Sequence, residues 1–337
     1  YWVGTMRGAI RVVDGEFQFF GHDRWIPHDK VNSIACGKSA AYIATDGGLG
    51  VINYEPYTLF KKAAWYEKWM EQWGQKRLGF IHNLVWDKDS QGYVRFMSDN
   101  DGGWVSHYLD ALCFKYAVTK DPAVREAAVD VFRSLKWCEE ITPIDGFPAR
   151  SIYAVGETGV QASTGSGGLP SEWNRTKDGK FEWKGDTSSD EVDAHIFATT
   201  LFIELVAQGK EKEAAQEHLS RIVGHIVREG WVLRDKDGKP TRWARWDPEY
   251  LQRPYGFLAR GLNGMEAFNY VVSAHALTGD PKFVDAKQQL LDWKYHHQSL
   301  RQKLVFPHVT HFDDRLAFYT YYPLLRYETD PYLRSIF

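Results

Sequence analysis

The stretch Gly185–His195 carries the densest group of acidic side chains in the chain, directly before the apolar run Ile196–Val206. Its acids are Asp186, Asp190, Glu191 and Asp193. Capping an ordinary helix start needs one or two acids, and Ser188 with Glu191 already fits the S-x-x-E capping box. The surplus of carboxylates suggests catalysis, with helix capping as the structural alternative.

A second acid-rich turn, Ser98–Trp104, also precedes an expected helix. Cleavage of a glycosidic bond needs a proton donor beside the leaving oxygen and a second carboxylate that activates water or attacks carbon. We therefore expect Asp101 to act as the acid and Asp190 as the base. Both carboxylates should then face one cleft, at about 6.5–9.5 Å for an inverting enzyme or about 5–5.5 Å for a retaining one.

Aromatic side chains are abundant, with 14 Trp, 18 Tyr and 19 Phe making up 15% of the chain. Several tryptophans lie beside acids and arginines in polar turns, where a flat apolar face next to hydrogen-bonding groups suits a sugar ring. Arginine has the planar fork that binds carboxylate or sulfate. The expected substrate-binding residues are Asp99, Trp104, His107, Arg150, Trp173, Trp183, Arg242, Trp243 and Arg245.

Two other functions fit the same residues. In a polysaccharide lyase, Tyr255 or His195 would abstract the proton beside a uronate carboxylate, and the product would absorb in the ultraviolet. In a non-catalytic glycan-binding module, aromatics and arginines would suffice. The candidate catalytic residues across the enzymatic alternatives are Asp101, Asp190, Glu191, His195 and Tyr255.

Composition limits the remaining possibilities. The chain has 337 residues, is 44% hydrophobic and carries a net charge of −3, so we expect no nucleic-acid partner. No apolar run is long enough to cross a membrane. Phosphate-binding, zinc-protease and serine-hydrolase motifs are missing, and we expect neither cofactor nor metal. Three cysteines without a C-x-x-C pair favour free thiols. The start at Tyr1 suggests a secreted or periplasmic product with its signal removed, while the oligomeric state does not follow from the sequence.

Residues 1–55 are expected to form β-strands. The segments that begin at Trp2 and Tyr42, 40 residues apart, share an aromatic start, a threonine and a glycine turn. Repeats of this period are typical of propeller blades, and these two resemble two-component-regulator propeller repeats.

Residues 56–337 are expected to form an α/α toroid that carries the catalytic residues. Helical hairpins are predicted around the turns Thr119–Pro122, Gly209–Lys212 and Thr278–Pro281. The first and third of these turns read Thr-x-Asp-Pro, and a shorter Thr-Asp-Pro occurs at Thr329–Pro331. Long irregular segments, 144–183 and 231–263, should converge with Asp99–Trp104 on one rim. Asp313 and Asp314 form the last acid-rich turn before an apolar helix.

Repeated helical hairpins, acids at helix starts and a tryptophan-rich rim resemble the carbohydrate-active α/α toroids. The unsaturated uronyl hydrolases and several polysaccharide lyase families are the nearest in architecture, and the resemblance runs from about Thr58 to the C-terminus. Asp99 with Asp101 and Asp190 with Glu191 resemble part of the paired-Asp pattern of the uronyl hydrolases. The resemblance implies a poly- or oligosaccharide substrate that contains uronate or sulfate.

Overall fold

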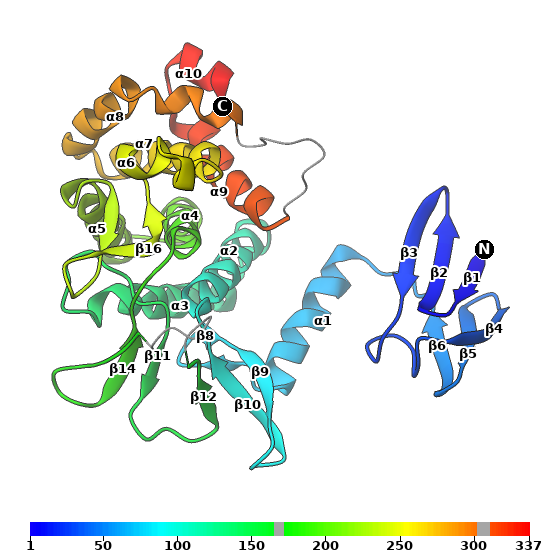
Figure 1. Ribbon diagram of the computed structural model, residues 1–337. Coiled ribbons are helices and arrows are strands. Elements are labelled where there is room, and N and C mark those ends of the chain that lie inside the picture. Colours follow the sequence, from blue (N-terminus) through cyan, green and yellow to red (C-terminus); the bar gives the residue numbers. More distant parts are fainter. Residues whose placement is uncertain (165–171, 302–310) are drawn as a thin grey trace. The chain divides into compact units, whose positions relative to one another are not determined.

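The computed structural model describes residues 1–164, 172–301 and 311–337, which divide into two compact units, Tyr1–Trp69 and Met70–Phe337 (Figure 1). The second unit is mainly helical, whereas small antiparallel sheets make up most of the first. All three cysteines are free thiols, as expected.

The first unit holds two three-stranded antiparallel sheets, each with its strands in chain order. They are β1 (Trp2–Thr5), β2 (Gly8–Val13) and β3 (Glu16–Phe20), then β4 (Val31–Cys36), β5 (Ala40–Thr45) and β6 (Gly48–Asn53). The two sequence repeats form equivalent turns: the Thr5 hydroxyl donates to Gly8 O at 2.7 Å, and the Thr45 hydroxyl donates to Gly48 O at 2.8 Å. The strands therefore occupy the residues that the sequence predicts.

Helix α1 (Leu59–Gln72) has no buried residue. The i, i+4 and i+8 spacing of Trp65, Trp69 and Trp73 predicts one core-facing helix face, but Trp65 is 45% and Trp73 51% exposed. Trp65 and Trp69 lie in α1, where Trp69 is partly buried, whereas Trp73 follows the end of the helix.

The helices of the second unit form hairpins at the predicted turns. In sequence order they are α2 (Asp101–Thr119) with α3 (Pro122–Glu140), α4 (Ser189–Leu205) with α5 (Lys210–Arg228), and α7 (Arg260–Thr278) with α8 (Lys282–Asp292). Short α6 (Pro248–Leu251) precedes α7, and α9 (His311–Tyr327) and α10 (Pro331–Ile336) end the chain.

The Thr-x-Asp-Pro turns end one helix and begin the next. At the first turn, the Asp121 carboxylate accepts from Ala123 N at 2.9 Å, and Pro122 supplies the first helical residue, which lacks an N–H to satisfy. At the second, Asp280 accepts from Lys282 N at 3.0 Å. Asp330 caps α10 in the same way.

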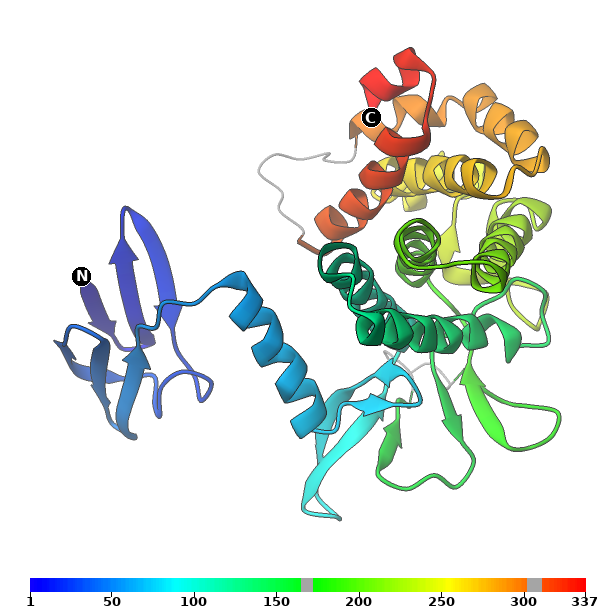
Figure 2. The ribbon, with the colours of Figure 1, turned by 180° about the vertical axis from the view of Figure 1, so that it is seen from behind.

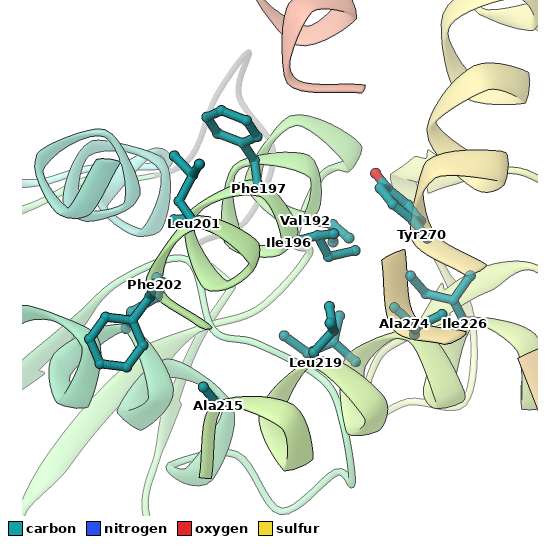
Figure 3. Packing of buried hydrophobic residues seen from close by; sticks show 14 of the residues in the cluster. Val192, Ile196, Phe197, Leu201, Phe202, Ala215, Leu219, Ile226, Tyr270 and Ala274 are labelled. Atoms are coloured by element: carbon teal, nitrogen blue, oxygen red, sulfur yellow. The ribbon is translucent and has the colours of Figure 1, made fainter. Parts of the chain in front are cut away.

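One helix of each hairpin contacts the others, since α2 contacts α4, α4 contacts α7, and both α4 and α7 contact α9. In Figure 2, α4 lies between α2 and α5. Figure 3 shows how side chains of α4 pack on more than one side of the helix. Phe197, Leu201 and Phe202 point in different directions, while Val192 and Ile196 lie on the side of Tyr270. Every residue of α4 from Glu191 to Ile203 is buried.

Short strands fill the connections between the helices. An antiparallel pair, β9 (Asn83–Asp87) and β10 (Gly92–Met97), precedes α2, and β12 (Val160–Ala162) joins it in parallel. The order β11 (Ile152–Ala154), β14 (Phe181–Lys184), β13 (Trp173–Arg175) forms a further sheet. Two hairpin-like pairs complete the set: β7 (Lys76–Arg77) with β8 (Phe80–Ile81), and β15 (Val232–Arg234) with β16 (Pro240–Arg245).

Candidate functional site

A cavity of about 520 Å³ opens at the helix starts of the second unit; we call it the main cavity. Asp99 and Asn100 reach it from the segment before α2, and Arg150 from the connection after α3. Arg242 and Trp243 reach it from β16, Leu258 and Ala259 from the segment before α7, and Leu262 and Asn263 from the first turn of α7. The first turns of α4 and α9 supply Asp190 and Asp313. The three segments expected to converge on one rim therefore all line the same cavity.

Three carboxylates line the main cavity, each from a different segment. Asp190 lies in the first turn of α4, where its Oδ1 accepts a hydrogen bond from the Ser188 hydroxyl. Asp313 lies in the first turn of α9. Asp99 accepts from Lys184 Nζ, and although burial opposes ionisation, this lysine lowers the pKa of Asp99 below its ordinary value. Asp99 is therefore already neutralised, whereas Asp190 is held by a neutral hydroxyl.

Arg150 brings a buried positive charge to this cavity. Its Nε donates to Asp186 O and its Nη1 to Asp99 O, both at 2.7 Å. Both acceptors are neutral backbone carbonyls, and no carboxylate of the described residues lies within ion-pair distance of the Arg150 guanidinium. Its charge also attracts the Asp99 and Glu191 carboxyls, but its hydrogen bonds go to carbonyls, which leaves the guanidinium able to pair with an anionic ligand.

The other two predicted arginines are neutralised within the protein. Arg242 lines the main cavity, but its Nε donates to Asp186 Oδ2 at 2.5 Å and its Nη2 to Glu172 Oε1 at 2.9 Å. Arg245 forms a two-point pair with Asp247, at 2.7 and 3.0 Å, and is not among the residues that line the cavity. Arg150 is thus the better placed of the three to bind an acidic group.

The tryptophans expected to bind sugar have different positions. Trp243 is 58% exposed and lines the main cavity, together with Phe312. Trp183 is buried in the core, edge-on to Phe147, so its predicted role as a sugar platform is wrong. Trp104 is half-buried on α2 and does not line the cavity. Its ring lies edge-on to His107.

Asp101 does not face the cavity, contrary to the prediction. It is fully buried, accepts from Ser98 N at 3.2 Å and from the Ser98 and Ser151 hydroxyls, and lies 3.1 Å from His82 Nδ1. These bonds connect the start of α2 to the segment before it and to Ser151, the residue before β11. The expected Asp101–Asp190 pair is therefore not present in one cleft, because Asp101 is a structural carboxylate.

Glu191 and His195 are also buried rather than exposed to substrate. Glu191 Oε2 accepts from Gly103 N at 2.9 Å, so the carboxyl caps α2 from a neighbouring helix instead of its own. Ser188 makes no side-chain cap bond, which means that the predicted capping box is wrong. Burial raises the pKa of Glu191 and lowers that of His195 well away from their ordinary values.

Glycines allow this contact between α2 and α4. A Cβ on Gly102 would lie 2.3 Å from Glu191 Oε2 and 3.0 Å from His195 Nε2, and one on Gly103 would lie 2.9 Å from Glu191 Oε1. The Gly102–Gly103 pair therefore permits the buried carboxyl to reach the helix N-terminus.

The remaining predicted residues lie outside the main cavity. Tyr255 is 66% exposed and donates to Glu249 O, so neither it nor His195 is placed as a base in this cavity. His107 Nε2 accepts from Arg315 at 2.8 Å. Burial and this guanidinium lower the pKa of His107 to about 4, which keeps its ring neutral at pH 7.

Two buried acids lie one helical turn beyond residues of the cavity wall. Asp193 follows Asp190 on α4 at i+3, and Glu266 follows Asn263 on α7 at i+3. Both are fully buried, and Glu266 Oε2 accepts from the Trp246 indole N–H at 2.9 Å. Burial raises the pKa of Glu266 to about 8, and repulsion from Asp190 and Asp313 adds to this rise. Burial also raises the pKa of Asp193 well above its ordinary value, with added repulsion from Glu266 and Asp190.

Phe312, Asn263 and Asp313 also line the main cavity and are not among the predicted site residues. The signal for Asp313 was the acid-rich turn before an apolar helix, the same signal that marks Asp190. Asn263 carried no comparable signal, since it reaches the cavity only through the packing of α7.

Among the described residues, no group of three or more His, Cys, Asp or Glu side chains is arranged to hold a metal ion. Nor does the part of the chain that the structure describes contain a helix with the length and apolarity to span a membrane. Comparison with known proteins finds no matching family, no characterised relative and no similar solved structure.

Proposed function

We propose that the second unit is a glycoside hydrolase that acts on an acidic oligo- or polysaccharide, containing uronate or sulfate, in the main cavity. The observation that carries this proposal is the buried Arg150 guanidinium, which has only carbonyl partners and shares the cavity with the carboxylates of Asp190 and Asp313. A neutral ligand would make no ion pair with this guanidinium, which among the described residues has carbonyl hydrogen-bond partners and only longer-range attraction to Asp99 and Glu191. An acidic sugar would form that ion pair.

In the proposed mechanism, Arg150 binds the carboxylate or sulfate of the sugar and Trp243 packs against its ring. Asp190 accepts a proton from water as the water oxygen bonds to the anomeric carbon. Asp313, in place of Asp101, donates its proton to the glycosidic oxygen as the bond from that oxygen to the anomeric carbon breaks. Both products are then saturated sugars, and the two carboxyl groups have exchanged protonation states.

We further propose that the helices of this unit form an α/α toroid. Three helical hairpins support this, because one helix of each hairpin contacts the next around α4 and α7. The N-terminal sheets are proposed to be propeller-type repeats, which the equivalent Thr5–Gly8 and Thr45–Gly48 turns support.

The test is turnover of acidic oligosaccharides by the Asp190→Asn variant. Loss of a general acid–base group should lower turnover about 100-fold or more. Its unfolding temperature should change little, since Asp190 is only partly buried. Asp285→Asn is the matched control, because Asp285 also lies in a first helical turn but on α8, outside the cavity.

The assay should record reducing ends and ultraviolet absorbance together. New reducing ends without absorbance are the expected result. A product that absorbs in the ultraviolet would indicate elimination instead of hydrolysis. Binding of the oligosaccharide without any product would indicate a non-catalytic glycan-binding module. Unchanged turnover in Asp190→Asn would remove this residue from the mechanism.

A further inference from the structure

A second cavity, of about 460 Å³, shares Arg242 with the main cavity. Its lining comes from β13 and the segment before it, from Asp186, and from the β15–β16 hairpin. We call it the second cavity. Because one side chain lines both spaces, a ligand longer than one sugar could contact both.

The boundary between the two cavities is held by hydrogen bonds on both sides of Asp186. Its carbonyl accepts from Arg150 Nε in the main cavity, and its carboxylate accepts from Arg242 N at 2.9 Å and Nε at 2.5 Å. Its own N–H donates to Asp235 Oδ2 at 2.7 Å. Asp186 adopts a left-handed backbone with φ of 52° that these bonds support. This wall is therefore built before any ligand arrives.

Trp173 lines the second cavity with a ring that is already fixed. Its indole N–H donates to Ser163 O at 2.8 Å, and the ring lies edge-on to Tyr153 with centroids 4.8 Å apart. The residue is only partly buried. A preordered aromatic ring loses little conformational freedom when a sugar packs against it.

The charges of the second cavity differ from those of the main cavity. Arg242 is paired with Asp186 and Glu172, and Lys239 lies 3.8 Å from Asp237. The lining carboxylates are Glu172, Asp186, Asp235 and Asp237, and the lining cations are Lys236, Lys239 and Arg242. Among the described lining residues each cavity has one more carboxylate than cations, so the difference lies in the cations. Those of the second cavity lie near carboxylates or, like Lys236, are exposed to water, whereas Arg150 of the main cavity is buried with carbonyl partners. An incoming carboxylate would therefore find no buried, unpaired cation in the second cavity, whereas sugar hydroxyls would find many acceptors.

We infer that the second cavity binds a neutral sugar residue joined to the acidic residue held at Arg150, so that the ligand is a heteroglycan in which acidic and neutral sugars are neighbours. This inference rests on the proposed function for the identity of the first site. The fixed Trp173 ring supplies the packing surface for the neutral sugar. The Asp235–Lys239 turn supplies its hydrogen-bonding groups.

Binding can be followed without turnover through the indole N–H resonances of ¹⁵N-tryptophan-labelled protein, with the Trp173 signal assigned by Trp173→Phe. The probes are cellobiose, mannobiose, galactobiose and xylobiose as neutral disaccharides, and glucuronate as an acidic monosaccharide. We expect at least one neutral disaccharide to shift the Trp173 signal, and glucuronate to leave it in place. If glucuronate shifts it, or no disaccharide does, the inference is overturned.

Variants test the same site by affinity. Trp173→Ala should weaken binding of the responding disaccharide about tenfold, the scale of one lost aromatic contact. Trp86→Ala is the control, since Trp86 is an exposed tryptophan that lines neither cavity. If Trp173→Ala fails to fold, Asp237→Asn takes its place. Asp237 lies at an exposed position of the second cavity, and asparagine keeps a side-chain oxygen that can accept from Lys239 N. This variant should weaken binding of the disaccharide several-fold.

The outcomes separate this inference from the proposed function. If acidic oligosaccharides are hydrolysed but Trp173→Ala and Asp237→Asn bind neutral disaccharides as well as Trp86→Ala does, the second cavity is not a sugar site and the proposed function stands. If the neutral disaccharide shifts the Trp173 signal and nothing is hydrolysed, the sugar site stands and the proposed hydrolysis fails.

Discussion

Replacing Gly102 by alanine tests the claim that α2 and α4 meet through a buried carboxyl. The new methyl group would lie 2.3 Å from Glu191 Oε2 and 3.0 Å from His195 Nε2. Glu191 is fully buried and its Oε2 holds the Gly103 N–H, so the carboxyl cannot move without breaking that bond.

The loss of unfolding free energy in Gly102→Ala follows from these contacts. An unpaired buried N–H costs about 1–3 kcal/mol, and overpacking of a filled core costs about 1–3 kcal/mol. Alanine returns at most about 1 kcal/mol of helix propensity, less so near a helix start. We therefore expect Gly102→Ala to lose about 2–4 kcal/mol of unfolding free energy, or roughly 5–15 °C in unfolding temperature for a unit of this size.

Gly224→Ala is the matched control, because Gly224 lies within α5 and a Cβ there would meet only the flexible Lys282 side chain, with Nζ at 3.6 Å and Cε at 3.8 Å. It should stabilise the protein by up to about 1 kcal/mol. The assay is chemical and thermal unfolding of both variants, monitored by circular dichroism and tryptophan fluorescence. If Gly102→Ala is as stable as the parent protein, the close contact between α2 and α4 is refuted.

Two further predictions concern buried acids. Asp101→Asn should lose about 2–3 kcal/mol of unfolding free energy, because an amide in its place must leave a hydroxyl or backbone donor unpaired. Thermal unfolding will measure the loss, and an unchanged unfolding temperature would contradict the structural role of Asp101. The pKa of Glu266 is raised to about 8 in the folded state, against 4.5 for an ordinary Glu. The free energy of unfolding therefore carries no penalty from Glu266 below pH 4.5 and falls by several kcal/mol as the pH rises from 4.5 to 8. Glu266→Gln should therefore show a flatter fall in stability between pH 4.5 and 8 than the parent protein does, and equal slopes in urea unfolding across that range would contradict the assignment.

The hairpins were predictable because their signals are local. Asp121 and Pro122 satisfy the first N–H groups of α3 from within the turn itself, and the turn at Thr278 repeats the same chemistry. The convergence of three rim segments also followed, since short turns at one end of a hairpin leave the long connections at the other.

The direction in which each acid points was not predictable in the same way. Asp101, Asp190 and Glu191 all sit at helix starts, yet only Asp190 lines the cavity. The choice depends on which neighbouring helix covers each side chain, a contact between residues far apart in the chain. One signal does exist, because the run from Val192 to Ile203 has no polar face, and acids embedded in such a helix are expected to be buried.

The same helix has a consequence for how the second unit assembles. Because α4 is covered by α2, α5, α7 and α9, its apolar surface finds its last partners only after residues beyond 311 have been made. A nascent chain ending after α5 would leave the α7 and α9 sides of α4 open to water, and such surfaces aggregate. The unit should consequently fold and unfold in one cooperative step rather than hairpin by hairpin, which sets it apart from open helical-repeat arrays in which each repeat contacts only its neighbours.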